Sequence, residues 1–206
     1  MARRTDEATG ASSAAPATRP ALTFARLSVT TLALLVAGLG VIGAVPRNNP
    51  RRGRPVPRKP VEIDRYLGLW YEFARYENRF ERGCEAVTAD YAWRPDGLIR
   101  IVNTCRQGGL MGRRRQAEAR GRVVPGSGNA KLKVAFFGPF FWGNYWVLDH
   151  AEDYSWSIVG EGSRRYLWIL TREAHPASER RALLLDRVQA LGYGPEKLHM
   201  TRHPEV

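Results

Sequence analysis

The sequence predicts an all-β fold, an eight-stranded antiparallel up-and-down barrel with one C-terminal α-helix. Three observations predict it: from residue 61 onward apolar and polar residues alternate, Gly, Pro, Asp and Asn interrupt this alternation at short intervals, and one amphipathic segment follows. Alternation is typical of strands with one buried face. Eight sequential strands in so short a chain favour a closed barrel, because closure leaves no unpaired edge.

The clearest strand runs from Ala130 to Phe137, where Leu132, Val134 and Phe136 share one face and lysines occupy the other. Seven further strands are predicted at 68–76, 84–94, 97–106, 115–124, 143–149, 154–160 and 165–172. The connections are short, and Arg94 to Gly97 is the clearest hairpin turn because Pro, Asp and Gly follow one another there.

The helix is predicted to begin at Ser178, which can serve as its N-cap. Leu184, Val188 and Leu191 form one apolar stripe, and Gly192 can end the helix in a left-handed conformation.

Composition limits the class of protein. The 206 residues fit one ordinary domain with additional segments, and 44% hydrophobic with 25% charged residues excludes a wholly disordered chain and a multi-span membrane protein. The net charge is +12, but residues 1–60 hold ten basic and two acidic residues. Most of the charge therefore flanks an apolar segment, and nucleic acid is not an expected partner.

We expect three segments before the barrel domain at 61–206: a basic disordered N-terminus at 1–26, a hydrophobic helix at 27–46, and a disordered linker at 47–60. The hydrophobic segment has 20 uncharged residues, enough to span a bilayer, and is either a transmembrane anchor or a signal segment. Its Gly38, Gly40 and Gly43 match a dinucleotide-binding pattern by chance, because prolines and arginines follow instead of a helix.

The linker holds six basic residues and four prolines. It is predicted to be an extended tether at the membrane surface or a solvated spacer.

The barrel region resembles the lipocalin family, in the branch of bacterial lipocalins and apolipoprotein D. The resemblance covers about residues 61–203 and begins with the G-x-W signature at Gly68 to Trp70. It continues through Phe80 to Cys84, Phe136 to Phe140, Leu148 to Tyr154 and Tyr166 to Arg172. The resemblance implies a lipocalin barrel that binds an apolar ligand, and a structural latch at its closed end formed by Gly68, Trp70, Asp149, Tyr154 and Arg172. Arg172 is expected to lie against the Trp70 ring as a cation–π pair.

The opposite end of the barrel is expected to be its mouth, where the loops combine apolar residues with arginines. An apolar pocket with guanidinium groups at its rim suits a fatty acid or lysophospholipid, although the arginines could also serve solubility alone. The predicted ligand-binding residues are Leu132, Val134, Phe136, Tyr145, Val147, Trp156 and Ile158 in the interior and Arg79, Arg113 and Arg114 at the rim. A shift of one residue in register would invert any of these strands.

Cys84 and Cys105 are on opposite arms of one predicted hairpin, nearly facing each other. A disulfide is the preferred interpretation, with buried free thiols or a reactive cysteine as alternatives. A disulfide would place the barrel in an oxidising compartment, on the periplasmic or extracytoplasmic face, anchored to the inner membrane or secreted after cleavage. The basic linker favours the cytoplasm by the positive-inside rule. No cysteine precedes Cys84, so attachment as a lipidated lipoprotein is not expected.

The sequence offers little for catalysis, because it holds no G-x-S-x-G, C-x-x-C or H-E-x-x-H motif. His199 and His203 are four apart but lack a nearby third ligand, so neither a metal nor a cofactor is expected. Glu72 and Glu118 are candidates to face the cavity. We therefore expect lipid binding, storage or transport in the bacterial cell envelope, supporting membrane maintenance. The alternatives are a carrier of haem, pigment or isoprenoid, or an isomerase that uses a cavity cysteine.

Overall fold

The structure, a computed structural model, describes residues 53–136 and 140–205. The predicted N-terminus at 1–26, the apolar segment at 27–46 and the first part of the linker lie outside these residues. Within the described ranges, no helix has the length and apolar character needed to cross a membrane.

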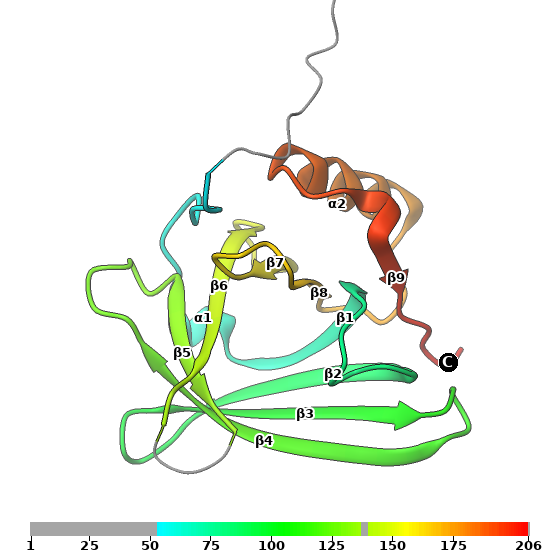
Figure 1. The fold of residues 1–206 in the computed structure, drawn as a ribbon, viewed down its shortest axis with the longest axis horizontal. Helices are drawn as coiled ribbons and strands as arrows, with labels where there is room; N and C mark the ends of the chain where they lie inside the picture. The colour runs from blue at the N-terminus through cyan, green and yellow to red at the C-terminus, as the bar shows by residue number, and fades with distance from the viewer. Residues whose placement is uncertain (1–52, 137–139, 206) are drawn as a thin grey trace, which may run out of the picture. The chain divides into compact units, whose positions relative to one another are not determined.

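All eight predicted strands and the predicted helix are present (Figure 1). In chain order the elements are α1 (Ile63–Tyr66), β1 (Gly68–Tyr76), β2 (Cys84–Trp93), β3 (Ile99–Gln107), β4 (Arg113–Val123), β5 (Lys131–Ala135), β6 (Gly143–His150), β7 (Trp156–Gly160), β8 (Leu167–Thr171), α2 (Ser178–Ala190), a 3-10 turn (Pro195–Lys197) and β9 (Leu198–Met200). The short helix α1 and the short strand β9 were not predicted by the sequence pattern, because neither is long enough to show a period.

The strands form a closed antiparallel barrel in which each of β2 to β7 pairs with the next strand, and β1 joins β8 to β2. β2 pairs with β1 only along the half of β1 nearest the closed end. Toward the mouth β9 pairs with β1 instead, and the next residues bond to β2 through the Ala86 amide and the Arg202 carbonyl (2.8 Å). The C-terminal segment therefore fills the gap between β1 and β2 at the mouth.

Two apolar cores lie on the two sides of the barrel wall. The inner core fills the closed half of the barrel with residues such as Trp70, Ile101 and Leu132. The outer core lies between the wall and α2 and includes Leu184 and Val188. The predicted apolar stripe of α2 therefore faces the barrel, as an amphipathic helix requires.

The limits of α2 differ slightly from the prediction. Ser178 is the first helical residue, and Ala177 holds the N-cap position without a side-chain hydrogen bond, so the prediction of Ser178 as N-cap is wrong by one residue. Gly192 follows the C-cap with φ +80°, and its amide donates to the Gln189 carbonyl (2.9 Å). Its role in ending the helix is the predicted one.

Residues 53–60, the second half of the predicted linker, lie against the domain rather than forming a free spacer. The Arg58 amide donates to the Leu148 carbonyl (2.9 Å), and Lys59 pairs with Glu152. Arg164 donates to the Gly53 carbonyl (3.0 Å). This extended, proline-rich segment therefore packs along the outside of the barrel.

Candidate functional site

The inward residues of β3 and β4 show how far solvent reaches into the barrel from the mouth. Ile101 pairs with Ala119, and both side chains belong to the inner core. One step closer to the mouth Asn103 pairs with Ala117, and alternation places these two on the same inner face. Ala117 is nevertheless exposed and Asn103 is partly exposed. The inner face of the barrel is therefore accessible to solvent from the mouth down to the layer of Ala117.

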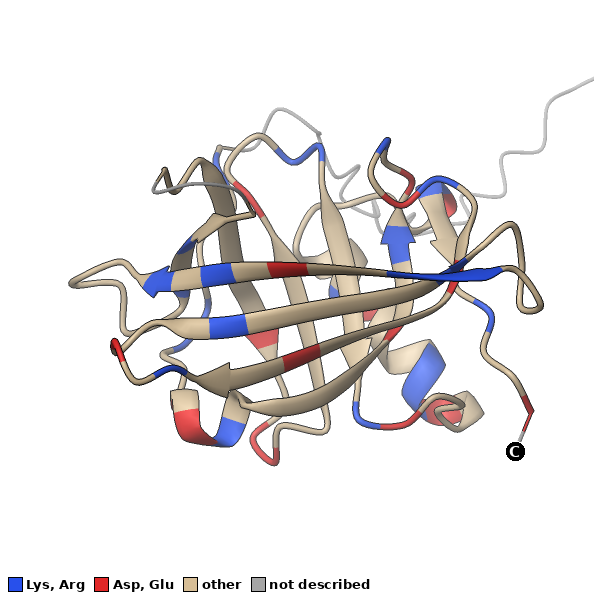
Figure 2. Ribbon diagram, turned by 90° about the horizontal axis from the view of Figure 1, so that it is seen from below, with Lys and Arg blue, Asp and Glu red and all other residues tan. Residues whose placement is uncertain are grey.

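Two arginines stand on this same inner face at the rim. Arg113 pairs with Gln107 and Arg115 with Cys105, in register with the inward residues further down β4. Arg115 donates to the Gln107 amide oxygen (2.6 Å), and both arginines are exposed. The continuous basic run at the start of β4 is visible in Figure 2.

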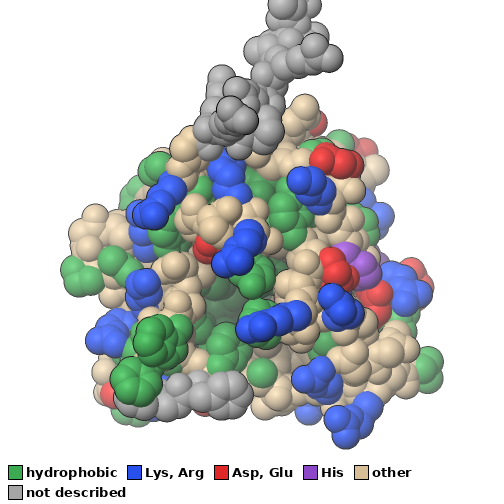
Figure 3. Space-filling view, viewed as in Figure 1, with side chains coloured by type: hydrophobic (Ala, Val, Ile, Leu, Met, Phe, Trp, Pro, Cys, Tyr) green, Lys and Arg blue, Asp and Glu red, His purple; other side chains and the backbone are tan. Residues whose placement is uncertain are grey.

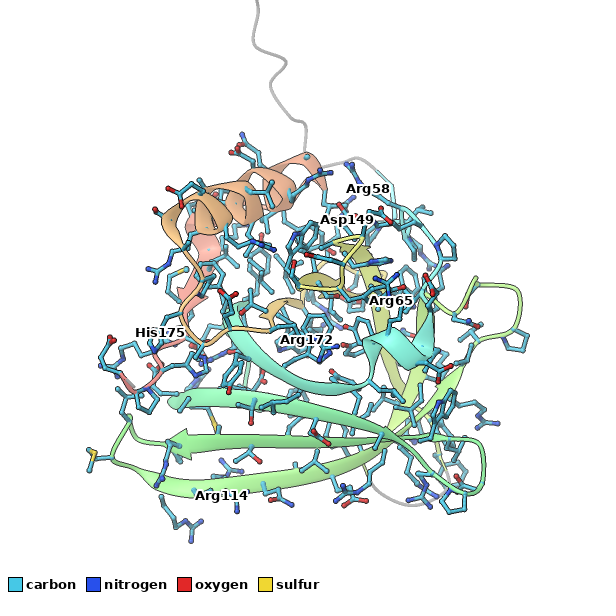
Figure 4. The ribbon with its side chains drawn as sticks, turned by 180° about the vertical axis from the view of Figure 1, so that it is seen from behind. Arg58, Arg65, Arg114, Asp149, Arg172 and His175 are labelled. Carbon is cyan, nitrogen blue, oxygen red and sulfur yellow. A yellow bond between two sulfur atoms is a disulfide. The ribbon has the colours of Figure 1, made fainter. Side chains whose placement is uncertain are left out.

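Arg114 lies between them in sequence and therefore on the outer face of β4. Its guanidinium donates to the Gln116 side chain (3.1 Å), and it points away from the barrel in Figure 4. The prediction that Arg114 belongs to the binding rim is wrong, because alternate residues of a strand point to opposite faces. Arg115, which was not among the predicted residues, occupies the inner-face position instead, and the same alternation could have identified it. Glu118 is also on the outer face, where it pairs with Arg100 (3.0 Å).

Other loops at the mouth expose apolar side chains. Arg79 lies over the Phe80 ring at 4.8 Å, and both residues are exposed. Large apolar side chains are also exposed at Met111, Phe136, Phe140 and Trp142. Figure 3 shows a hollow near the centre of one face, with hydrophobic side chains in and beside it and basic side chains around it.

The structure divides the predicted interior residues into three groups. Leu132, Val134, Tyr145 and Val147 lie in or against the inner core. Phe136 lies beyond the end of β5 and is 48% exposed, so it is at the rim rather than inside. Trp156 and Ile158 lie in the outer core beneath α2. Placing these two in the interior was wrong by one residue of register.

Their neighbours Ser157 and Val159 face inward instead. All five residues of β7 are buried, on one side by the barrel and on the other by α2. A strand buried on both faces shows no alternation of polarity, so the sequence could not identify its inner face.

The floor of the cavity is a chain of four hydroxyl groups. The Tyr66 hydroxyl bonds to those of Tyr145 (2.8 Å) and Ser157 (3.1 Å), and the Tyr145 hydroxyl bonds to that of Tyr91 (2.8 Å). Tyr91 is on β2 and Tyr145 on β6, so the chain crosses the barrel interior. Burial raises the pKa of Tyr66 to about 12 and the pKa values of Tyr91 and Tyr145 well above their ordinary value. The floor is therefore polar but uncharged.

One side of the interior holds a buried glutamate–arginine pair. Glu72 and Arg75 lie 2.8 Å apart on β1 and are almost completely buried. Thr201 donates to the Glu72 carboxylate, and Arg75 also donates to the Glu81 carbonyl (3.0 Å). Burial and the nearby charge of Glu81 raise the pKa of the Glu72 carboxyl to about 8, against the opposing effect of Arg75. Glu72 was predicted to face the cavity, whereas Arg75 was not predicted to be buried, since an arginine in a strand is usually exposed.

The loop between β1 and β2 is fastened to this side of the barrel. The Glu81 carboxylate accepts hydrogen bonds from the Trp168 indole (2.8 Å) and the Asn78 amide (2.6 Å). Because Trp168 packs against the inner core, this loop covers part of the mouth.

The closed end shows most of the predicted latch. The Arg172 guanidinium lies over the Trp70 ring, and a Cβ at Gly68 would stand 3.6 Å from it. Gly68 has φ +89°, a conformation that favours glycine. The Tyr154 hydroxyl accepts the Glu62 amide (2.7 Å), which fixes the residue before α1. Figure 4 shows Arg172 beside α1.

Asp149 is not part of this cluster. Its carboxylate is buried near α2, where one oxygen accepts the His150 amide (3.0 Å) and the other lies 3.6 Å from Arg187. A register shift between Val147 and Asp149 in the pairing of β6 with β7 turns this side chain outward. Including Asp149 in the latch was wrong for that reason.

Cys84 and Cys105 form the predicted disulfide, between the first residues of β2 and the last residues of β3 at the mouth. Both half-cystines are buried and pack with Val87. Within residues 53–136 and 140–205, no group of three or more His, Cys, Asp and Glu could hold a metal ion.

Residues 61–203 match the family model for the lipocalin-like domain. The outer membrane lipoprotein Blc of Vibrio cholerae is 43% identical over 58% of this chain and 71% of its own length. Temperature-induced lipocalin-1 of Arabidopsis thaliana is 36% identical over 69% of this chain and 80% of its own length. Apolipoprotein D of Macaca fascicularis is 32% identical over 73% of this chain and 83% of its own length.

The fold also matches solved structures at low sequence identity. The major allergen Per a 4 from cockroaches superposes with a TM-score of 0.57 at 16% identity, covering 75% of this chain and 94% of the allergen. Insecticyanin from the tobacco hornworm Manduca sexta gives the same TM-score at 15% identity, covering 75% of this chain and 86% of insecticyanin. The match over residues 61–203, the relatives and the closed barrel together show that this chain belongs to the lipocalin family, in the branch of bacterial lipocalins and apolipoprotein D.

Proposed function

We propose that this protein binds a fatty acid or a lysophospholipid, with the acyl chain inside the barrel and the anionic group at Arg113 and Arg115. The observation that carries the proposal is the inner face of β4. Ala117 is solvent-accessible on that face, and the two arginines stand directly above it at the rim. An apolar wall below a pair of guanidinium groups matches the two ends of an anionic amphiphile.

The residues lining the wall make room for a chain. Ala117 on β4 and Ala89 on β2 are small residues in the same inward layer, on either side of Asn103. Below this layer Ala119 is packed in the inner core, so the space for a ligand is the part of the barrel above it. The interior of an eight-stranded barrel holds one small ligand where side chains do not fill it. Binding free energy would come mainly from buried methylenes, at about 0.8 kcal/mol each.

The envelope is the compartment we propose. The disulfide requires an oxidising environment, and the relatives from Vibrio cholerae and Escherichia coli are named outer membrane lipoproteins. We propose that residues 27–46 attach or export the protein and that the barrel stores or transports lipid for the membrane. Both cysteines are in the disulfide, which disfavours an isomerase that needs a cavity thiol and favours a binding protein over an enzyme.

The proposal is tested by titrating saturated fatty acids of increasing chain length into the purified protein and following tryptophan fluorescence. We expect affinity to rise steeply with each added methylene until the cavity is filled, and then to level off. Affinity that does not depend on chain length would contradict binding inside the barrel.

A further inference from the structure

The four hydroxyls of the floor, those of Ser157, Tyr66, Tyr145 and Tyr91, hold one hydrogen-bond donor that nothing in the described part of the chain uses. Each hydroxyl has one proton, and three hydrogen bonds join the four groups. Three protons are used and one remains. Because hydroxyl protons rotate, the chain can present this free donor at any of its members, and the same groups keep free lone pairs to accept.

This floor lies directly beneath the open part of the cavity. Tyr91 pairs with Ile101, which pairs with Ala119, so these three form one inward layer. The next layer toward the mouth contains Asn103 and the exposed Ala117. Tyr145, in the middle of the hydroxyl chain, is itself only half-buried. A ligand that fills the accessible part of the barrel therefore reaches the hydroxyl chain at Tyr145, its least buried member.

A plain acyl chain is a poor match for that end. Its terminal methyl would cover the accessible Tyr145 and offer no acceptor to the free donor of the chain, which is unfavourable for a polar group that loses contact with water. An oxygen at the same position would accept the free donor or donate to a lone pair. The floor thus distinguishes ligands by the polarity of their inner end.

We infer that the hydroxyl chain is a binding site for an oxygen atom at the inner end of the ligand, so that the protein selects lipids oxygenated at the end remote from the anionic group. This inference rests on the proposed function, since the rim arginines determine which end of the lipid stays outside.

The experiment compares palmitic acid with its ω-hydroxylated analogue on the wild-type protein and on Tyr91→Phe/Tyr145→Phe. In wild type the analogue should bind at least as tightly as palmitic acid. In the double variant the ratio of the two dissociation constants should shift by about ten-fold in favour of palmitic acid. Tyr76→Phe is the matched control, because its hydroxyl bonds to Gly194 outside the cavity; it should leave the ratio unchanged.

A second comparison needs no variant. The ω-hydroxy acid and an isomer hydroxylated at mid-chain have the same composition, but only the first places its oxygen at the floor. Wild type should prefer the ω-hydroxy isomer by about ten-fold. Equal affinity for the isomers, together with tight binding of palmitic acid, would overturn the inference and leave the proposed function standing. Failure of all three acids to bind would contradict both.

Discussion

The guanidinium carbon of Arg172 lies 3.7 Å from the centre of the Trp70 ring. The same guanidinium donates to the backbone carbonyls of Arg65 (3.0 Å), Leu67 (2.9 Å) and Leu69 (2.6 Å). The residue after β8 thereby binds the end of α1 and the start of β1. This contact closes the barrel at the end opposite the proposed binding site.

Replacing either partner should reduce stability without changing ligand preference. Arg172→Ala should lower the free energy of unfolding by about 2–4 kcal/mol, because a cation–π contact and several charged hydrogen bonds are lost. Trp70→Ala should cost about 3–5 kcal/mol. Arg172→Lys should recover less than half of the unfolding free energy lost in Arg172→Ala, since an ammonium group cannot reach three carbonyls as the planar guanidinium does. Urea unfolding measures each change, and Arg100→Ala, at an exposed ion pair, is the control with an expected change below about 1 kcal/mol. An altered order of ligand affinities in Arg172→Ala would contradict a purely structural role.

Cys84 and Cys105 should resist a thiol reagent until the protein is reduced. Their disulfide closes a segment with a sequence separation of 21. Cys84→Ala/Cys105→Ala should therefore lower the free energy of unfolding by about 3 kcal/mol. Mass spectrometry of protein purified from its own host and treated with the reagent measures directly how many cysteines are labelled. Two labels on the unreduced native protein would remove the main argument for an oxidising compartment.

Stability should fall as the pH rises from about 4.5 to about 8, because of Glu72. In the folded protein burial raises the pKa of its carboxyl to about 8, above the ordinary glutamate value of about 4.5. The folded state therefore binds a proton that the unfolded state has released in this interval. The resulting slope is at most about 1.4 kcal/mol per pH unit. Glu72→Gln resembles the protonated form and should flatten the slope in urea unfolding measured across this interval. An unchanged slope in Glu72→Gln would show that Glu72 keeps its charge throughout.

Charge reversal at the rim should depend on which face of β4 is changed. Arg113→Glu/Arg115→Glu should weaken the binding of a fatty acid by about ten-fold or less, since exposed ion pairs contribute modestly, and salt should reduce the difference. A monoacylglycerol of equal chain length should bind nearly as before. Arg114→Glu, one residue away on the outer face, is the matched control and should change neither affinity. Equal losses for the anionic and the neutral lipid would mean that the arginines act on folding.

The sequence predicted the fold well because most strands have one polar face. β5 shows why: Lys131 and Lys133 alternate with Leu132 and Val134, and the structure places the two groups on opposite sides. The prediction failed where that contrast is missing. β7 is buried on both faces, so Trp156 was assigned to the wrong side.

The site was harder to predict than the fold, because its position depends on contacts between distant segments. The run of three arginines at 113–115 indicates a basic edge, and alternation separates Arg114 from the other two. The pairing of Arg113 with Gln107 then shows which of the two sets faces the interior. The floor likewise joins residues from α1, β2, β6 and β7 that no local pattern relates. The outward turn of Asp149 arises from a register shift, which the sequence does not mark.

Native mass spectrometry of the protein purified without detergent from its own host is the sharpest test of lipid binding inside the barrel. We expect one bound molecule per chain, with the mass of a fatty acid or lysophospholipid, and less of it after Arg113→Glu/Arg115→Glu. A bound haem, pigment or other compound without an acyl chain would contradict it.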